Sequence, residues 1–340
     1  MFIFNLIYTF ITLLNELKTN EHHDIRIAGK KGFYSNIIKR IFTDIDYIYL
    51  IGKIIKIKLL KQKTPLFAII DINNICNLHC KHCYWWLTRD GEKKELTSND
   101  WKKIIKEKIK NNHILQTNLV GGEPLLRKDV LDVFNEELSG KFTIVTNGTF
   151  ELIPYSGLIN YWISIDGNKE THDKIRGESF YKIEKNVQKY VKETGKKVWI
   201  SMTINSWNSD QIVEVAEHWK DLADGINFQI HTPFMENDPL WIPYGEYRNE
   251  LLDKIIALKR KYPNYVIHEE KQLNLLRSPW GGDKNMPINC PNWAILVLDH
   301  QAESKTPCCL GSAKDTDQKP ICEYCGMSNY SSLFSRGIHL

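Results

Sequence analysis

The stretch Cys76-Asn-Leu-His-Cys80-Lys-His-Cys83 lies shortly after a β-branched run at Leu66–Asp71. Cysteine thiolates are soft ligands for zinc and for iron–sulfur clusters, and a complete [4Fe–4S] site uses four of them. Three thiolates on one loop can hold three irons and leave the fourth open, as a catalytic metal site requires. A zinc site completed by His79 or His82, or a reactive thiol cluster, is the alternative, although C-x3-C-x2-C differs from the usual C-x2-C zinc pairs.

Around this loop, from Pro65 to His231, short β-branched runs alternate with stretches of helical periodicity. The alternation amounts to about six βα units and predicts an α/β fold, a partial (β/α)6 TIM-type barrel, with its chemistry at the carboxyl ends of the strands. The expected strands are Leu66–Asp71, His113–Val120, Phe142–Thr146, Tyr161–Ile165, Val198–Ile204 and Ile226–His231, and the expected helices are Asn99–Asn111, Arg127–Leu138, Tyr181–Thr194 and Asp210–Leu222.

Composition excludes several classes of protein. The chain has 340 residues, of which 42% are hydrophobic and 25% charged, so general disorder is excluded. A net charge of +4 does not argue for nucleic acid as a partner. No apolar run reaches the roughly 18–20 residues of a membrane span. The eight cysteines fall into two groups, at 76–83 and 290–325, which predicts two metal sites in a reducing compartment, the cytoplasm.

The chain divides into three expected regions: an amphipathic helical segment at 1–64, the barrel core at 65–285 and a cysteine-rich module at 286–340. Met1–Leu14 is apolar but lacks the charged n-region and cleavage site of a signal peptide. Ile45–Lys63 places isoleucines and Leu59 at helical spacing, with lysines on the flanks or the opposite face. Such a helix either lies on the inner face of an anionic membrane, as a peripheral contact, or packs its apolar stripe on the core.

The cysteine loop resembles that of the radical S-adenosylmethionine (SAM) superfamily, C-x3-C-x-Φ-C, with His82 at the usually aromatic position. Gly121-Gly122-Glu123-Pro124, after the second expected strand, is similar to the GGEP element of that family. Two glycines let the backbone approach a ligand, and the Glu123 carboxylate can accept hydrogen bonds from a cationic amine. A simple turn is the alternative role of this element.

The segment Ser164-Ile165-Asp166-Gly167, followed by Arg176-Gly177, resembles the region after the fourth strand in peptide-modifying members of the family. The resemblance implies that Ser164 and Arg176 lie near the methionine part of SAM. It implies also that Asp166 and Asn147 lie near the ribose or the amino group. For Arg176, a surface ion pair with a nearby acidic residue is the alternative.

The resemblance implies a mechanism and its cofactors. A reduced [4Fe–4S] cluster at Cys76, Cys80 and Cys83 passes an electron to bound SAM, which breaks to methionine and a 5′-deoxyadenosyl radical. That radical abstracts hydrogen from an unactivated carbon or adds to a double bond. The cofactor supplies the hard chemistry, and the protein positions the substrate and excludes water. A flavodoxin- or ferredoxin-type protein is the expected reductant, and the sequence identifies no catalytic acid or base.

The carboxyl-terminal cysteines form the second group. Cys290, Cys308, Cys322 and Cys325 match a closed [4Fe–4S] site or a structural zinc site with four cysteine ligands. The spacing is similar to the abbreviated SPASM-type module called twitch, which carries an auxiliary cluster. The Pro-Cys sequence at 307–308 favours Cys308 over Cys309, although Gln301-Ala302 replaces the Asp-Gly usual in that hairpin.

For the substrate, the sequence leaves three hypotheses. The layout resembles that of adenosylhopane synthase, with a basic amphipathic helix and a Cys290-Pro-Asn-Trp293 stretch, and this favours a membrane lipid or isoprenoid. A peptide- or protein-modifying maturase is the alternative, although those enzymes commonly carry seven cysteines in a full SPASM module. A non-catalytic iron–sulfur or zinc module is the third. Trp85, Trp86, Trp241 and Trp280 are candidates for lining an apolar pocket, with core packing as the alternative.

Overall fold

The computed structural model describes residues 44–89, 94–280, 290–313 and 318–338. The apolar segment Met1–Leu14 and the expected boundary at residues 281–287 lie outside these ranges. None of the described helices is long and apolar enough to cross a membrane.

A single parallel sheet forms the centre of the fold. Its seven strands are arranged in the order β6-β5-β4-β3-β2-β1-β7, and every neighbouring pair is parallel. β6 and β7 are the two ends of that order, so the sheet is an open, partial barrel. The strands are β1 (Phe67–Asp71), β2 (Gln116–Val120), β3 (Phe142–Thr146), β4 (Leu158–Ser164), β5 (Val198–Ile204), β6 (Ala223–Ile230) and β7 (Ile295–Leu298).

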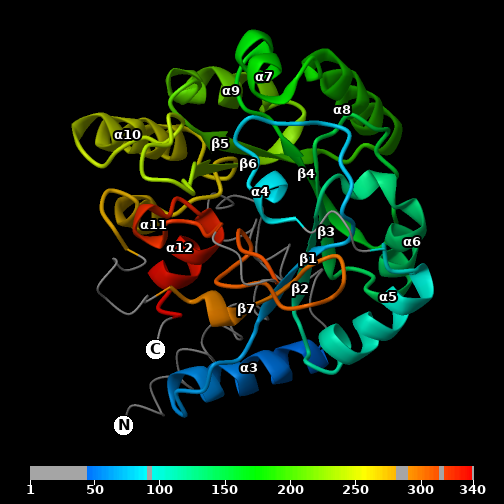
Figure 1. The fold of residues 1–340 in the computed structure, drawn as a ribbon. Helices are drawn as coiled ribbons and strands as arrows, with labels where there is room; N and C mark the ends of the chain where they lie inside the picture. The colour runs from blue at the N-terminus through cyan, green and yellow to red at the C-terminus, as the bar shows by residue number, and fades with distance from the viewer. Residues whose placement is uncertain (1–43, 90–93, 281–289, 314–317, 339–340) are drawn as a thin grey trace, which may run out of the picture. The chain divides into compact units, whose positions relative to one another are not determined.

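Helices cover the outside of the curved sheet, as Figure 1 shows. α8 illustrates why: its buried residues Phe180, Ile183, Val187 and Tyr190 recur at helical spacing and form one face. The helices are α3 (Asp44–Lys58), α4 (Trp85–Thr88), α5 (Ser98–Ile104), α6 (Lys128–Glu137), α7 (Lys169–Arg176), α8 (Phe180–Thr194), α9 (Ile212–Trp219), α10 (Glu246–Lys261), α11 (Glu270–Leu275) and α12 (Ser328–Ser335), with a π-helical turn at Ile105–Lys110 and 3-10 turns at Pro124–Leu126, Ser209–Gln211, Asn292–Ala294 and Cys322–Tyr324.

The expected α/β class and all six expected strands are confirmed, with boundaries that shift by a few residues. β7 was not predicted. It belongs to the cysteine-rich region, and it pairs with β1 in register from Phe67↔Ile295 to Ile70↔Leu298. A four-residue apolar run is too short for periodicity to identify. The carboxyl-terminal region therefore shares the sheet of the core.

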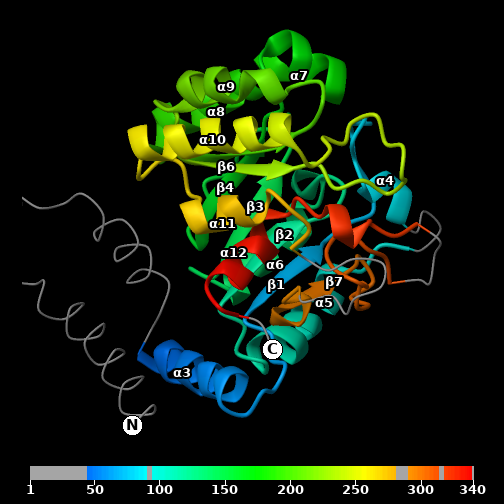
Figure 2. The ribbon, with the colours of Figure 1, turned by 90° about the vertical axis from the view of Figure 1, so that its left-hand side faces the viewer.

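α3 lies at the amino ends of β1 and β2 (Figure 2). The side chain of Lys53 is buried and donates to the carbonyl of Pro65, just before β1, at 2.5 Å. Lys58 donates to the carbonyl of Gly337. Ile48 and Leu59, by contrast, are 68% and 46% exposed. The expected stripe therefore packs on the core only in part: Ile51 and Ile54 are half-buried, whereas Ile48, Ile55 and Leu59 are exposed.

Candidate functional site

The first cysteine group lies on the loop between β1 and α4, at the carboxyl end of the sheet (Figure 1). All eight cysteines of the chain are free thiols. Burial raises the pKa of Cys76 and Cys80 and raises that of Cys83 to about 12, and charge on Cys80 adds to the rise at both Cys76 and Cys83. The three thiols therefore lie within electrostatic reach of one another, as ligands of one metal group must.

The cysteine loop is joined directly to the Gly-Gly element after β2. Asn73 accepts a hydrogen bond from Gly122 N at 3.0 Å and donates to the Glu123 carbonyl at 2.7 Å. Glu123 N donates to the carbonyl of Ile75 at 2.8 Å. A Cβ on Gly122 would stand 1.9 Å from Ile75 O, so only glycine permits this contact. The predicted glycine motif thus sets the position of the cysteine loop.

Glu123 is fully buried, and the hydrogen-bond partners of its carboxylate are other groups of this protein. Its carboxylate accepts hydrogen bonds from Leu125 N at 3.0 Å, Thr146 Oγ1 at 2.6 Å and Asn147 N at 2.8 Å. Burial raises the pKa of this carboxyl group. The contacts tie the loop after β2 to the loop after β3, and they occupy most of the acceptor sites expected to serve a ligand amine.

Asn147 extends the same connection back to the cysteines. Its Nδ2 donates to Asn77 Oδ1 at 2.9 Å, and its Oδ1 accepts from Thr149 N at 2.9 Å. Asn77, the residue after Cys76, in turn donates to Thr149 Oγ1 at 2.9 Å. The loops after β1 and β3 are therefore fixed against each other at this end of the sheet.

Asp166 and Arg176 form a buried ion pair beside the cysteines. Arg176 Nε lies 2.5 Å from Asp166 Oδ2, and Arg176 Nη1 lies 3.9 Å from Cys80 Sγ. His82 Nε2 lies 3.3 Å from the same carboxylate oxygen, and burial lowers the pKa of His82 to about 4. The expectation that Arg176 forms only a surface ion pair is therefore wrong. Ser164 ends β4, opposite Ser201 of β5.

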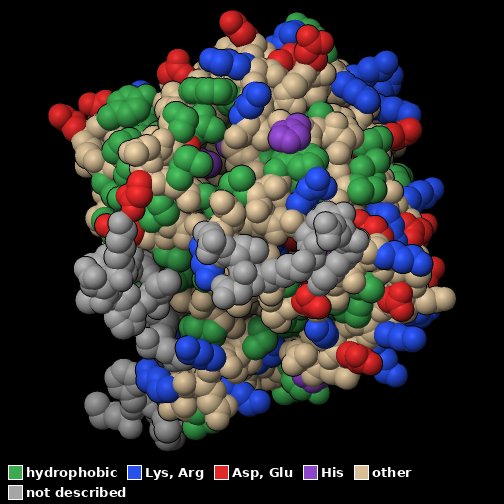
Figure 3. Space-filling model, in the orientation of Figure 1, with side chains coloured by type: hydrophobic (Ala, Val, Ile, Leu, Met, Phe, Trp, Pro, Cys, Tyr) green, Lys and Arg blue, Asp and Glu red, His purple; other side chains and the backbone are tan. Residues whose placement is uncertain are grey.

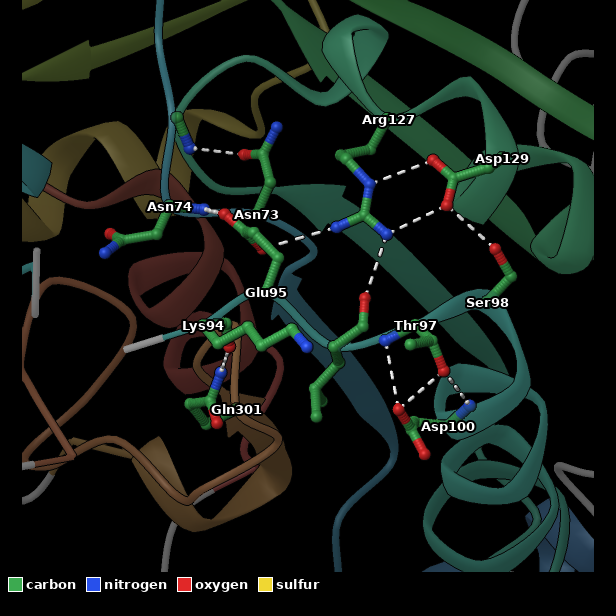
Figure 4. A network of polar contacts seen from close by, with 12 residues as sticks. Asn73, Asn74, Lys94, Glu95, Thr97, Ser98, Asp100, Arg127, Asp129 and Gln301 are labelled. Carbon is green, nitrogen blue, oxygen red and sulfur yellow. Dashed lines mark hydrogen bonds and ion pairs between the residues drawn. The ribbon is translucent and has the colours of Figure 1, made fainter. Parts of the chain in front are cut away.

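A further network joins the segment after α4 to the loop after β2 (Figure 4). Glu95 Oε1 accepts from Asn74 N at 2.5 Å, and Glu95 Oε2 lies 3.4 Å from Arg127 Nη1. Arg127 also holds Asp129 at 2.9 Å, and Gln301 donates to the carbonyl of Lys94. The chain on both sides of the cysteine loop is thereby braced against the core and against the hairpin after β7.

The carboxyl-terminal cysteines lie in three segments: Cys290 precedes β7, Cys308 and Cys309 follow the hairpin after β7, and Cys322 and Cys325 lie near the carboxyl end of β6. The segment with Cys322 and Cys325 reaches β6, where Gly326 N donates to Thr232 Oγ1 at 2.9 Å and Ile230 N donates to Gly326 O at 3.1 Å. A Cβ on Gly326 would stand 2.0 Å from Ile230 O. Cys308 and Cys309 follow the hairpin after β7, in which Leu298 bridges Ser304 and Ala302 takes a φ of 60°.

These five thiols influence one another. Burial and then charge on Cys325 and Cys322 raise the pKa of Cys290. Cys308 donates to Cys309, which lowers the pKa of Cys309 while raising that of Cys308. Cys309 is buried, whereas Cys308 is partly exposed. Within the described ranges, no three His, Cys, Asp or Glu side chains are placed to hold a metal ion.

An ion pair connects the two cysteine groups. Lys305 Nζ lies 2.7 Å from Asp71 Oδ2, and both side chains are buried. The same ammonium lies 5.4 Å from the ring centroid of Tyr84, the residue after Cys83. Charge on Lys305 also contributes to the lowered pKa of Cys309.

Sequence reasoning found the cysteines, the glycines and the Asp166–Arg176 segment, but it missed three polar side chains that hold them. Asn73, Asn77 and Lys305 give no motif signal, although Asn73 lies two residues after a predicted strand. Among the candidate tryptophans, the burial of Trp85 and Trp280 agrees with the core-packing alternative. Trp85 lines a hollow with Asp71, Arg89, Asp299 and Lys305, which is polar. Trp86 stacks on His79 at 4.3 Å, Trp241 stacks on Tyr324 at 4.1 Å, and Trp280 is buried.

Comparison with known proteins agrees with this geometry. Residues 70–218 match the model of the Radical SAM superfamily. The chain is 31% identical over 164 residues to the sporulation killing factor maturation protein SkfB of Bacillus subtilis, covering 45% of this chain and 39% of SkfB. It is 30% identical over 263 residues to the antilisterial bacteriocin subtilosin biosynthesis protein AlbA of the same organism, covering 72% of this chain and 55% of AlbA.

Residues 70–218 therefore form a radical SAM domain, and the chain is similar to enzymes that carry such a domain. It spans between two fifths and just over half of the length of these two curated relatives. In fold it is similar to SuiB of Streptococcus suis in a crystal structure with the precursor peptide SuiA. The TM-score is 0.61 at 17% identity, over 99% of this chain and 79% of SuiB.

Proposed function

We propose that this chain cleaves SAM reductively at a [4Fe–4S] cluster held by Cys76, Cys80 and Cys83 and uses the resulting radical to modify a peptide or protein. The observation that carries the proposal is the convergence of the three thiols, the Gly122 turn and the Arg176–Asp166 pair at one end of the sheet. The thiol donor set fits an iron–sulfur cluster, which binds each thiolate to a different iron.

With its cluster and SAM bound, the site supplies one-electron cleavage of the sulfonium C–S bond. The protein's own contribution is position and charge. Arg176 offers N–H donors beside Cys80, where they suit the carboxylate of SAM, and Asp166 holds the guanidinium in place. Glu123 and Asn147 keep the surrounding loops fixed, and Ser164 lies at the same edge. Buried, braced loops exclude water from a reactive intermediate.

A peptide substrate has more support than a lipid. SkfB and AlbA are named for the maturation of a killing factor and the biosynthesis of a bacteriocin. For the carboxyl-terminal group we propose Cys290, Cys308, Cys322 and Cys325 as ligands of an auxiliary [4Fe–4S] cluster, because four thiolates are the complete ligand set of such a cluster. A small flavodoxin- or ferredoxin-type protein is the proposed electron donor.

The test is anaerobic reconstitution followed by mass spectrometry. The loaded chain is given dithionite, SAM and peptides translated from short reading frames next to its gene, and both 5′-deoxyadenosine and peptide mass are measured. We expect 5′-deoxyadenosine from the native chain and none from Cys80→Ala. A peptide mass change that requires SAM supports a peptide substrate. If a total lipid extract stimulates the reaction and peptides do not, the peptide proposal is wrong.

A further inference from the structure

The face of α3 that points away from the core is apolar. Ile48 and Ile55 lie at helical spacing and are 68% and 40% exposed, and Leu59 and Leu60, just beyond the helix, are 46% and 59% exposed. The ring of Tyr49 stacks on His113 with centroids 3.4 Å apart and still leaves the residue 40% exposed. A contiguous exposed apolar stripe of this kind marks an interaction surface.

Two lysines of α3 reach toward the core instead of covering this stripe. Lys53 and Lys58 donate to the carbonyls of Pro65 and Gly337, and Ile57 between them is fully buried. α3 is thus held to the core by its lysine-bearing face. The stripe is therefore turned outward by specific contacts of the opposite face.

Charge beside the stripe identifies its partner. Lys56, Lys61 and Lys63 are exposed, and the sequence contains no Asp or Glu between Asp46 and Asp71. In Figure 3 basic and hydrophobic side chains intermingle over the lower part of the face, where α3 lies in Figure 1. An apolar stripe with a basic border is complementary to the surface of an anionic bilayer, where acyl chains lie beneath phosphate groups.

We propose that α3 docks this chain on an anionic lipid surface through Ile48, Ile55 and Leu59, with Lys56, Lys61 and Lys63 contacting the phosphates. α3 lies at the amino ends of β1 and β2 (Figure 2), whereas Cys76, Cys80 and Cys83 follow the carboxyl end of β1. A bilayer bound at α3 therefore faces the pole opposite the first cysteine group. The lipid is an anchor rather than the substrate, and this inference stands independently of the proposed reaction.

The test is sedimentation of the full chain with vesicles of phosphatidylcholine alone or mixed with phosphatidylglycerol. We expect binding to the mixed vesicles, weakened by salt. The triple variant Ile48→Gln/Ile55→Gln/Leu59→Gln should lose about tenfold or more in affinity. The matched control is Tyr181→Gln/Val213→Gln/Met235→Gln, which changes side chains of similar exposure, 64%, 44% and 58%, on other elements and should bind as the native chain does.

Three outcomes would overturn the proposal. The native chain could fail to bind either kind of vesicle. The triple variant could bind like the native chain, which would assign binding to another segment such as residues 1–14. Sedimentation velocity could show a native dimer that the triple variant disperses, which would make a second copy the partner of the stripe. Equal melting temperatures of the variants and the native chain exclude misfolding as the cause of lost binding.

Discussion

Lys305 and Asp71, which are 234 positions apart in the sequence, form a buried ion pair at 2.7 Å that joins the hairpin after β7 to the end of β1. The pair lies beside Tyr84, between the two cysteine groups. It connects the carboxyl-terminal region to the core by charge, as the β1–β7 pairing does by backbone hydrogen bonds. Both connections hold the cysteine-rich region against β1, the strand that leads into the first cysteine group.

Removing one member of this pair should destabilise the fold strongly. Lys305→Met leaves Asp71 as a buried, uncompensated charge, and we expect a loss of about 3 kcal/mol in the free energy of unfolding. The double variant Lys305→Met/Asp71→Leu removes both charges and should recover most of that loss. Urea unfolding of the native chain, Lys305→Met, Asp71→Leu and the double variant measures the effect. Equal losses for the single and double variants would show that packing, and not charge, is responsible.

Arg176 should be required for SAM cleavage beyond its contribution to folding. Arg176→Gln removes the guanidinium from Asp166 and Cys80, and we expect at least about a tenfold lower rate of 5′-deoxyadenosine formation. The matched control is Lys169→Gln on the same helix, whose partly exposed ammonium pairs with Asp173 at 2.9 Å. Iron content after reconstitution must be the same in both variants. A rate for Arg176→Gln equal to that of the control would exclude the assigned role.

Acid should destabilise the protein through buried histidines, of which His268 is the clearest. Its Nε2 accepts from Phe228 N at 2.7 Å, and burial lowers its pKa from 6.5 to about 4. A depressed pKa means that the folded state keeps the ring neutral, so the stabilisation is complete above pH 6.5 and is lost as the pH falls toward 4. For this one histidine we expect a loss of about 2 kcal/mol between pH 7 and pH 5.

The measurement is urea unfolding at pH 7 and pH 5. His268→Gln retains an acceptor for Phe228 N without a titrating ring, so it should show a smaller difference between the two pH values than the native chain. His218→Gln, which changes an exposed histidine, serves as the control. If the stability of His268→Gln depended on pH as strongly as that of the native chain, His268 would be ruled out as a source of the loss of stability in acid.

The sequence predicts the repeating part of the fold and the groups with strong chemical signatures. Strands such as Val198–Ile204 and helices such as Phe180–Thr194 follow from periodicity, because burial on one face repeats along them. Asn73 could not be predicted as a link between loops, because its two hydrogen bonds depend on how β1 and β2 pair. The outward stripe of α3 could not be predicted either, because periodicity defines two faces without saying which one meets the core.

Cys308, rather than Cys309, should be the ligand from the adjacent pair. Cys308 is partly exposed, like the other expected ligands Cys290, Cys322 and Cys325. Cys309 is buried, and its backbone N–H donates to Tyr330 Oη at 3.1 Å.

We therefore expect Cys308→Ala to lose roughly four irons per chain on reconstitution, the content of one cluster, and Cys309→Ala to retain them. Iron and sulfide assays with electron paramagnetic resonance of the reduced protein measure this content separately for the two cysteine groups. Cys83→Ala should lose the other four irons and keep the auxiliary signal. Loss of the auxiliary signal in Cys309→Ala but not in Cys308→Ala would reverse the assignment, and retention in both would show that either thiol can complete the site.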